Sequence, residues 1–518
     1  MGILGEQYTR TTRAAVALVA ALAVAVPAER ASAAIRQTVV VMTTPSHGAA
    51  AERFVRDAGG RVTHELSVID GFIATVPRTV VSGLAAVPGV RSVTPDRPVH
   101  LEALYGQDSG AASAVYSDVV RATKTWGTGD TGAGTAVAVI DTGINTTGDL
   151  AGQVVRAVDF TSDGDNLDHY GHGTFVGGLI AGTGAHSSGS IMGVAPGTSL
   201  VSLKISGADG ATDVTLVLEA LEWVKDYAST YNIRVVNLSL GFASQQSYLV
   251  DPLDYAVEKL WNSGVVVVTA AGNGGSTGPI LAPGNDPFVV TVGAINDRTT
   301  VTSSDDYLAS FSSVGPTADA LAKPDVLAPG RSVVSSRSPG STVDLANPTS
   351  EIGDVYARAS GTSFSTAIVS GVAALILSRS PWLTPNQVKL RLMSTARALP
   401  GGNTPGTGAG VVDAFGATMS TSTASANVSA VPAVGGGSLQ ATRGPACLRD
   451  STGNCMTDAD ANAVLGYDPN AYWAPQWSQS EWVGSQWVGS QWVGSQWVGS
   501  QWVGSQWVGS QWVMAAAS

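Results

Sequence analysis

The sequence contains very little cysteine. Only two cysteines occur in 518 residues, Cys447 and Cys455, and both lie near the C-terminus. A structural zinc site needs more ligands than this pair offers, whereas in an oxidising compartment the two thiols would close a small loop as a disulfide. The rest of the chain has no cysteine, so packing alone must hold it together.

Basic residues are also scarce. The chain has 28 Lys and Arg against 40 Asp and Glu, which gives a formal net charge of −12, and charged residues make up only 13% of it. Binding to nucleic-acid phosphates needs clustered Lys and Arg, and no basic block is present, so no nucleic-acid partner is expected. The apolar content of 44% predicts a folded globular protein and excludes global disorder.

The N-terminal residues have the pattern of an export signal. Arg10 and Arg13 precede an apolar stretch at residues 14–26, and Ala31-Ser32-Ala33 has the small-x-small form of a cleavage site. The apolar stretch is shorter than the roughly 18 residues that a membrane span needs. We therefore expect residues 1–33 to be a signal peptide and the mature protein to be secreted, with no membrane span.

Two regions of the chain differ in their expected secondary structure. Residues 34–105 read as strand, helix, strand, strand, helix, strand, the split βαβ pattern of a small ferredoxin-like α/β domain. Residues 114–415 alternate short apolar runs with helical segments, and runs such as GVVVVTA suit strands buried on both faces. This alternation predicts an α/β fold with a doubly wound, mostly parallel sheet.

The C-terminal part has low complexity. Residues 416–470 are rich in Ser, Thr, Ala and Gly, which predicts a linker that contains the expected Cys447–Cys455 disulfide. Residues 471–518 contain a Trp-Val-Gly-Ser-Gln repeat. A five-residue period forms no single aromatic stripe on a helix or a strand. The tail could be a stacked solenoid, could self-associate from a disordered state, or could stack on cell-wall sugars.

Three segments each place a reactive side chain at the end of a strand or the start of a helix. Asp141 follows the apolar run at 135–140, whereas His172 and Ser363 each open an expected helix. A serine hydroxyl becomes a nucleophile when an imidazole takes its proton, and a buried carboxylate fixes the imidazole tautomer. Each segment alone is more often a turn or a helix cap, but the chain order Asp, His, Ser is one of the known triad orders.

These segments, AVIDTGI, GHGTFVGGLIAG and SGTSFSTAIVSGVAALI, resemble the subtilisin family of serine peptidases over residues 114–414. The resemblance implies that Asp141 is the orienting carboxylate, His172 the general base and acid, and Ser363 the nucleophile. It also implies that Asn273 donates a side-chain hydrogen bond to the oxyanion, on which negative charge builds in the transition state.

The resemblance further implies where a substrate binds. The implied residues are Ser239, Leu240, Gly241, Ala270, Ala271, Gly272 and Leu281. The first three would pair with an extended peptide as an added strand, and the next three would form a wall of the pocket beside the scissile bond. Leu281 would lie near the floor of that pocket, which predicts an apolar or small side chain there.

The N-terminal α/β region also has an implied role. In the resembled family a small prosegment assists folding and inhibits the enzyme until self-cleavage. Residues 34–105 fit this pattern, and the cut is expected between Leu101 and Ala114. Large α/β folds with non-local contacts fold slowly, which makes a folding assistant physically reasonable.

The chemistry outlined above requires no cofactor, although calcium is possible. Asp163, Asp165 and Asp168 cluster in one loop before His172, and carboxylates at such spacing can bind the ion. The strict calcium-loop pattern is absent, so we expect a solvated acidic loop instead.

Two functions of different classes follow from the sequence. The first is a secreted serine endopeptidase that hydrolyses protein or peptide substrates through an acyl-enzyme intermediate and has its own propeptide as an inhibitor. The second is a catalytically silent secreted protein that binds or assembles at a surface through its Trp-repeat tail. The intact set of Asp, His, Ser and Asn favours the first. The chain order Asp, His, Ser disfavours other α/β hydrolases, in which the serine comes first.

Overall fold

The computed structural model describes most of the chain between residues 36 and 435. The described residues are 36–45, 47–96, 98–101, 103–105, 114–242, 247–402 and 404–435. The expected export signal at 1–33, the expected disulfide Cys447–Cys455 and the repeat tail at 471–518 lie outside the described residues, and all three remain predictions.

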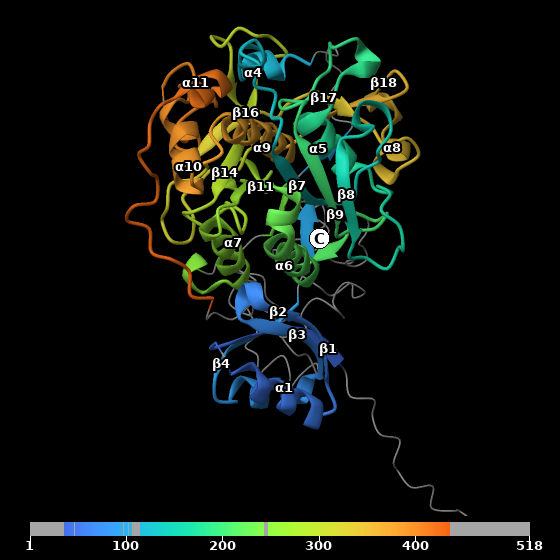
Figure 1. Cartoon of the computed structure of the whole chain (residues 1–518), viewed down its shortest axis with the longest axis vertical. Coiled ribbons are helices and arrows are strands. Elements are labelled where there is room, and N and C mark those ends of the chain that lie inside the picture. The colour runs from blue at the N-terminus through green and yellow to red at the C-terminus, as the bar shows by residue number, and fades with distance from the viewer. Residues whose placement is uncertain are drawn as a thin grey trace, which may run out of the picture.

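Residues 36–96 form a small α/β unit, called here the N-terminal module (Figure 1). Its elements are β1 (Arg36–Thr43), α1 (Gly48–Asp57), β2 (Arg61–Leu66), β3 (Gly71–Pro77), α2 (Val81–Ala85) and β4 (Val90–Pro95). The strands pair in antiparallel fashion in the order β2-β3-β1-β4. Val41 and Phe72 share an apolar cluster with Val55 of α1 and Leu84 of α2, so both helices cover the same face of the sheet.

The opposite face of this small sheet is buried against the rest of the protein. Val40 and Met42 alternate with Val41 along β1, and they belong to the main hydrophobic core instead of the core of the module. Val68 and Ile69, in the turn between β2 and β3, join the same core where the turn meets α6 and α7. The N-terminal module therefore relies on the larger unit to bury its second face.

The larger unit is built around an eight-stranded sheet. Its strands are β7 (Ala136–Asp141), β8 (Val154–Asp159), β9 (Ser199–Lys204), β11 (Ile233–Leu238), β13 (Val266–Ala270), β14 (Val290–Asn296), β15 (Tyr307–Leu308) and β16 (Val326–Pro329). Their order is β15-β14-β13-β11-β7-β9-β8, with β16 also beside β14. Every pairing is parallel except that of β14 with β15, which confirms the expected mostly parallel sheet.

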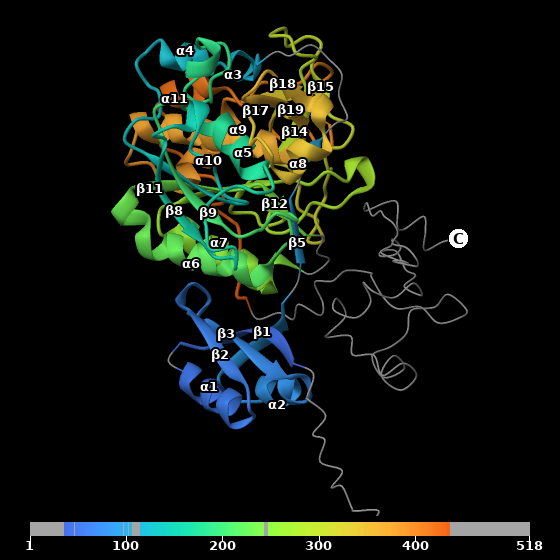
Figure 2. The same cartoon turned by 90° about the vertical axis from the view of Figure 1, so that its right-hand side faces the viewer.

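Helices cover both faces of this sheet (Figure 2). The helices of the larger unit are α3 (Tyr116–Val119), α4 (Ala122–Trp126), α5 (His172–Ala181), α6 (Val214–Tyr231), α7 (Pro252–Asn262), α8 (Thr342–Ala346), α9 (Thr362–Arg379), α10 (Pro385–Ser394) and α11 (Ala414–Met419). Helices α5 and α9 pack against each other on one face, and α6 and α7 pack against each other on the opposite face.

Helix α9 crosses the core of the larger unit. It is long and apolar enough to cross a membrane by length and composition, but 89% of its apolar window is buried inside the fold. It contacts five strands of the sheet as well as α5, α10 and α11. Its apolar character is therefore explained by packing between the sheet and its neighbours.

Two small sheets join residues 98–105 to the larger unit. The first has the order β10 (Thr212–Asp213), β5 (Pro98–Leu101), β12 (Leu240–Gly241). The second contains β17 (Val333–Ser336), β19 (Tyr356–Ser360), β18 (Glu351–Ile352) and β6 (Leu104–Tyr105). All their pairings are antiparallel. The segment that follows the N-terminal module thus contributes one strand to each sheet.

Polar contacts fasten the N-terminal module onto α6 and α7. Glu222 of α6 accepts hydrogen bonds from the hydroxyl of Ser67 at 2.7 Å and from the backbone N–H of Val68 at 2.5 Å. The hydroxyl of Tyr255 on α7 donates to Asp70 at 3.0 Å. The module is therefore held by directional bonds as well as by its apolar face.

Residues 420–435, called here the strap, return from α11 towards the N-terminal module (Figure 1). The expected linker at 416–470 begins inside α11, and the strap is bonded to the larger unit. The hydroxyl of Tyr248 donates to the carbonyl of Val431 at 2.8 Å, and the N–H of Ala433 donates to Glu258 at 2.9 Å. A segment of linker composition is thus an ordered part of the fold, because its backbone is hydrogen bonded.

The end of the strap also contacts the N-terminal module. Arg91 donates to the carbonyl of Val434, and the hydroxyl of Ser92 donates to the carbonyl of Gly435 at 3.4 Å. Gly435 has a φ of 61°, and a side-chain carbon there would lie 2.4 Å from Cε of Met42 and 3.0 Å from Cγ of Tyr255. The strap, the module and α7 therefore meet at a position whose positive φ and close neighbours favour glycine.

Candidate active site

The carboxylate of Asp141 and the imidazole of His172 are in direct contact. Asp141 is the last residue of β7 and His172 the first of α5, and both side chains are fully buried. Nδ1 of His172 lies 2.7 Å from Oδ1 and 2.9 Å from Oδ2 of Asp141. The backbone N–H of Thr142 donates to the same Oδ1 at 2.8 Å. This contact fixes the ring orientation and directs Nε2 away from Asp141.

Ser363 lies in the first turn of α9 and is also buried. Its hydroxyl donates to the carbonyl of Ser239 at 2.9 Å, and the hydroxyl of Ser239 donates back to the carbonyl of Ser363 at 2.8 Å. Phe364, the next residue, has its ring 5.6 Å from that of His172. Among the described residues, Nε2 of His172 has no hydrogen-bond partner. The serine hydroxyl is therefore engaged with a backbone carbonyl, and the helix that carries it packs against the helix of His172.

Asn273 is bonded to the residue that precedes Ser363. It follows β13 through Ala271 and Gly272, and its amide oxygen accepts from the N–H of Thr362 at 3.0 Å and from the hydroxyl of Thr362 at 3.1 Å. Since the oxygen faces Thr362, the NH₂ group lies on the other side of the amide carbon. This geometry fixes the orientation of a hydrogen-bond donor beside the N-terminus of α9.

The strand that is expected to bind a peptide, β12, is paired with another strand of the same chain. In β12, Leu240 pairs with Leu101 and Gly241 with His100 in antiparallel register. On the other side of this segment, Thr212 pairs with Val99. Residues 98–101 are therefore the middle strand of a three-stranded sheet whose outer strands both belong to the larger unit.

The chain then continues past the helix that carries Ser363. Leu104 pairs with Ser360, at the end of β19, and Ser363 follows Ser360 by three residues. On the opposite side, Ser239, whose carbonyl holds the Ser363 hydroxyl, directly precedes Leu240. Ser363 is therefore close to both Leu240, the partner of Leu101, and Ser360, the partner of Leu104.

Leu281 lies between the two expected walls of the pocket. Its backbone N–H donates to the carbonyl of Ala271 at 3.1 Å. A methyl group on Gly272 would be 2.8 Å from Cγ of Leu281, and one on Gly241 would be 2.8 Å from its Cβ. The leucine side chain thus fills the space beside both glycines. Ala270 is the last residue of β13 and is buried.

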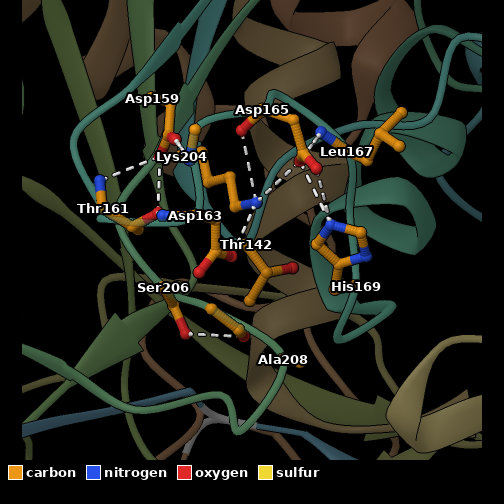
Figure 3. A network of polar contacts seen from close by, with 12 residues as sticks. Thr142, Asp159, Thr161, Asp163, Asp165, Leu167, His169, Lys204, Ser206 and Ala208 are labelled. Carbon is orange, nitrogen blue, oxygen red and sulfur yellow. Dashed lines mark hydrogen bonds and ion pairs between the residues drawn. The ribbon is translucent and has the colours of Figure 1, made fainter.

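The three acidic residues considered for calcium do not share one site (Figure 3). Asp163 and Asp165 face the ammonium group of Lys204, at 2.9 Å and 3.3 Å, and Asp165 also contacts Nε2 of His169 at 3.0 Å. Asp168 points elsewhere. Within the described part of the chain, no group of three or more His, Cys, Asp and Glu side chains is arranged to hold a metal ion.

Asp168 instead joins the Asp141 loop to the helix of His172. It accepts from the hydroxyl of Thr142 at 2.7 Å and from the N–H groups of Gly171 at 2.6 Å and Thr174 at 2.7 Å. Burial raises the pKa of its carboxyl, and these hydrogen bonds oppose that rise. This role of Asp168 is not among those expected from the sequence. An acidic residue four positions before His172, at the start of an expected helix, was the available signal.

Known proteins resemble this chain in sequence and in fold. A profile described as the subtilase family matches residues 132–418. The serine protease AprX of Bacillus subtilis (strain 168) is 39% identical over 323 residues, which are 60% of this chain and 71% of AprX. Subtilisin NAT of Bacillus subtilis subsp. natto is 34% identical over 354 residues, which are 67% of this chain and 80% of that protein.

One solved structure is similar in fold. It is that of fervidolysin from Fervidobacterium pennivorans, described as a keratinolytic enzyme related to subtilisin, with a TM-score of 0.60 and 24% identity. The similarity covers 74% of this chain and 61% of the fervidolysin chain. At this identity the likeness bears on the fold alone.

The hydrogen bonds of Asp168 predict a large effect of its removal. In Asp168→Ala, the Thr142 hydroxyl and the backbone N–H groups of Gly171 and Thr174 lose their acceptor, and we expect the free energy of unfolding to fall by about 2–4 kcal/mol. Denaturant unfolding of the full chain measures this change. Asp226, which is half exposed and paired with Lys225, provides the control, and Asp226→Ala should change stability by less than about 0.5 kcal/mol. Equal effects of the two substitutions would contradict the prediction.

Proposed function

This chain belongs to the subtilase family, and from that premise we propose that it is a secreted serine endopeptidase with Asp141, His172 and Ser363 as its catalytic triad. The observation that carries the proposal is the buried contact of His172 with Asp141, with Nε2 facing no other partner among the described residues. An imidazole held in this way is suited to take a proton from a hydroxyl and return it to a leaving group.

In the proposed reaction, Ser363 is the nucleophile. Its hydroxyl leaves the carbonyl of Ser239, transfers its proton to Nε2 of His172 and attacks the carbonyl carbon of the peptide bond. The carboxylate of Asp141 stabilises the imidazolium that forms. His172 then gives the proton to the leaving amine. In the second half of the reaction, water replaces the serine hydroxyl as the nucleophile and gives its proton to His172. The acyl group is released, and the proton returns to Ser363.

Asn273 is proposed to stabilise the oxyanion of the tetrahedral intermediate. The amide oxygen is bonded to Thr362, which leaves its NH₂ group as the donor end beside the first turn of α9. The backbone N–H of Ser363 lies at the N-terminus of the same helix, where the helix dipole favours negative charge. Both donors are held before the charge develops, which makes them effective in the transition state.

Substrates are proposed to bind as an added strand along β12. The chain's own residues 98–101 already pair with Leu240 and Gly241 in this way, which supports peptide binding through main-chain hydrogen bonds. Leu281 reduces the depth of the pocket between Gly241 and Gly272. We therefore propose a preference for a small side chain on the residue whose carbonyl is attacked.

The N-terminal module is proposed to be an inhibitory propeptide within residues 34–105. Its connecting segment occupies the position of a substrate strand and so excludes other peptides from β12. Nothing in the described residues favours the alternative of a catalytically silent binding or surface-assembly protein. Protein or peptide substrates are the partners that this proposal requires, and no step of it requires a cofactor.

The nucleophile can be tested with a fluorophosphonate probe. We expect the secreted wild-type protein to be labelled and Ser363→Ala to remain unlabelled, because only an activated serine is phosphonylated. Ser365 lies on the same helix, is equally buried and donates to the carbonyl of Ala328, so Ser365→Ala is the matched control and should still be labelled. Labelling of Ser363→Ala would contradict Ser363 as the nucleophile, whereas a wild-type protein that stays unlabelled would favour the silent alternative.

The two strand registers predict where the chain cuts itself. Leu101 is paired on one side of Ser363 and Leu104 on the other, so the bond that is cleaved should lie between these residues. We expect the N-terminus of the mature protein to be residue 102, 103 or 104 when it is sequenced. A mature N-terminus anywhere else would show that residues 98–105 do not occupy the path of a cleaved substrate.

The floor of the pocket predicts a change in specificity. In Leu281→Gly the side chain beside Gly241 and Gly272 is absent, so large residues should be accepted. We expect the ratio of kcat/KM for phenylalanine over alanine at the cleaved position to rise by about tenfold or more. Leu345→Gly, at an exposed leucine, is the control and should leave this ratio unchanged. An unchanged ratio in Leu281→Gly would show that Leu281 does not form the floor of the substrate pocket.

A further inference from the structure

The loop between β8 and α5 contains oxygen atoms of the kind that bind calcium in proteins. Within this loop, Asp163 and Asp165 bring two carboxylates, and the backbone carbonyl of Asp165 turns inward beside them (Figure 3). Carboxylates and carbonyls are the ligands that calcium prefers. The residues around these oxygens determine whether a metal ion fits.

An ammonium group occupies the centre of this oxygen cluster. Nζ of Lys204 lies 2.9 Å from the carboxylate of Asp163, 3.3 Å from that of Asp165 and 3.3 Å from the backbone carbonyl of Asp165. The side chain of Lys204 is fully buried, whereas those of Asp163 and Asp165 are partly exposed. A calcium ion at this point would overlap with the ammonium group, and the two positive charges would repel each other. The residues present therefore do not fit the metal.

Lys204 is rigidly placed by the central sheet. It is the last residue of β9, and its Cα is in register with Asp141 of β7 on one side and with Asp159 of β8 on the other. Burial lowers the pKa of its ammonium group, but hydrogen bonds to Asp163 and Asp165 outweigh burial and raise the pKa overall. The lysine is therefore charged at neutral pH and directed from the strand that neighbours Asp141 into the loop.

The loop held by Lys204 leads directly to the proposed active site. Asp165 also accepts from the N–H of Leu167 at 2.9 Å and contacts His169 at 3.0 Å, and Asp168 follows it by three positions. Asp168 in turn holds the first turn of α5, where His172 lies. A restraint on the conformation of Asp163 and Asp165 is therefore also a restraint on the start of the helix that carries His172.

We propose that Lys204 is a built-in cation that takes the place of a metal ion in this loop and is a positioning residue for the helix of His172. A cation that is covalently part of the chain cannot dissociate, so the order of the loop does not depend on the concentration of an ion. This inference adds to the proposed function, but it concerns the conformation of the loop and is testable without catalysis.

The test measures amide hydrogen exchange in residues 160–171 of the full chain in a Ser363→Ala background, which removes self-cleavage. With Lys204 present, we expect the same protection in a calcium chelator and in millimolar calcium. In Lys204→Met we expect exchange in the chelator to be faster by about tenfold or more, and calcium to restore protection, since two carboxylates and a carbonyl are then without a cation. Lys204→Arg, which keeps a charge, should stay protected without calcium.

Lys225→Met is the matched control, because Lys225 also pairs with two carboxylates, those of Glu222 and Asp226, but at the surface. It should show no response to calcium in residues 160–171. If Lys204→Met does not fold in the chelator, the recovery of folded protein in calcium gives the same readout. Full protection of Lys204→Met in the chelator, or loss of protection that calcium does not restore, would overturn the inference.

Discussion

The contact between His172 and Asp141 is the interaction on which the arrangement of the larger unit depends. A carboxylate and an imidazole without access to water are stable only when surrounding groups hold them, because burial penalises their charged forms. The end of β7 supplies one partner and the start of α5 the other, so the loop between them must place α5 accurately over the sheet. The hydrogen bonds of Asp168 and the ion pairs of Lys204 meet this demand at two points of the loop.

The same edge of the sheet also receives the chain's own N-terminal segment. The free edge of strand β12 would present unpaired backbone N–H and C=O groups, and β5 pairs with this edge here. The N-terminal module buries its second face on α6 and α7, so the segment that follows it is delivered to β12 by a docked domain. Binding along this edge and burial of the module are therefore coupled parts of one interface.

The fold was predictable because its signals are local. Apolar runs such as residues 135–140 and 264–270 predict central strands, and His172 is expected at the start of a helix, where α5 begins. Strand β14 was not predicted, since Thr291 and Gly293 interrupt its apolar pattern. The strap was read as a linker, because backbone hydrogen bonds, which leave no trace in composition, hold it in place.

Parts of the site could not be predicted for a different reason. The role of Lys204 comes from partners about 40 positions earlier, and the sequence alone does not show that a strand residue points into that loop. Asp168 was grouped with Asp163 and Asp165 by spacing, but its partners lie on the Asp141 loop and on α5. The engagement of Ser363 with the carbonyl of Ser239 likewise depends on a side-chain rotamer, which no motif encodes.

The glycine at the end of the strap has a thermodynamic consequence. Since Gly435 contacts Met42 of the N-terminal module and Tyr255 of α7, and Arg91 and Ser92 bind the strap's carbonyls, the two ends of the described chain stabilise each other's attachment. Linkage of this kind is reciprocal, so whatever weakens the hold on one end weakens the hold on the other by the same free energy. The N-terminal module and the strap are thus expected to detach from the larger unit together.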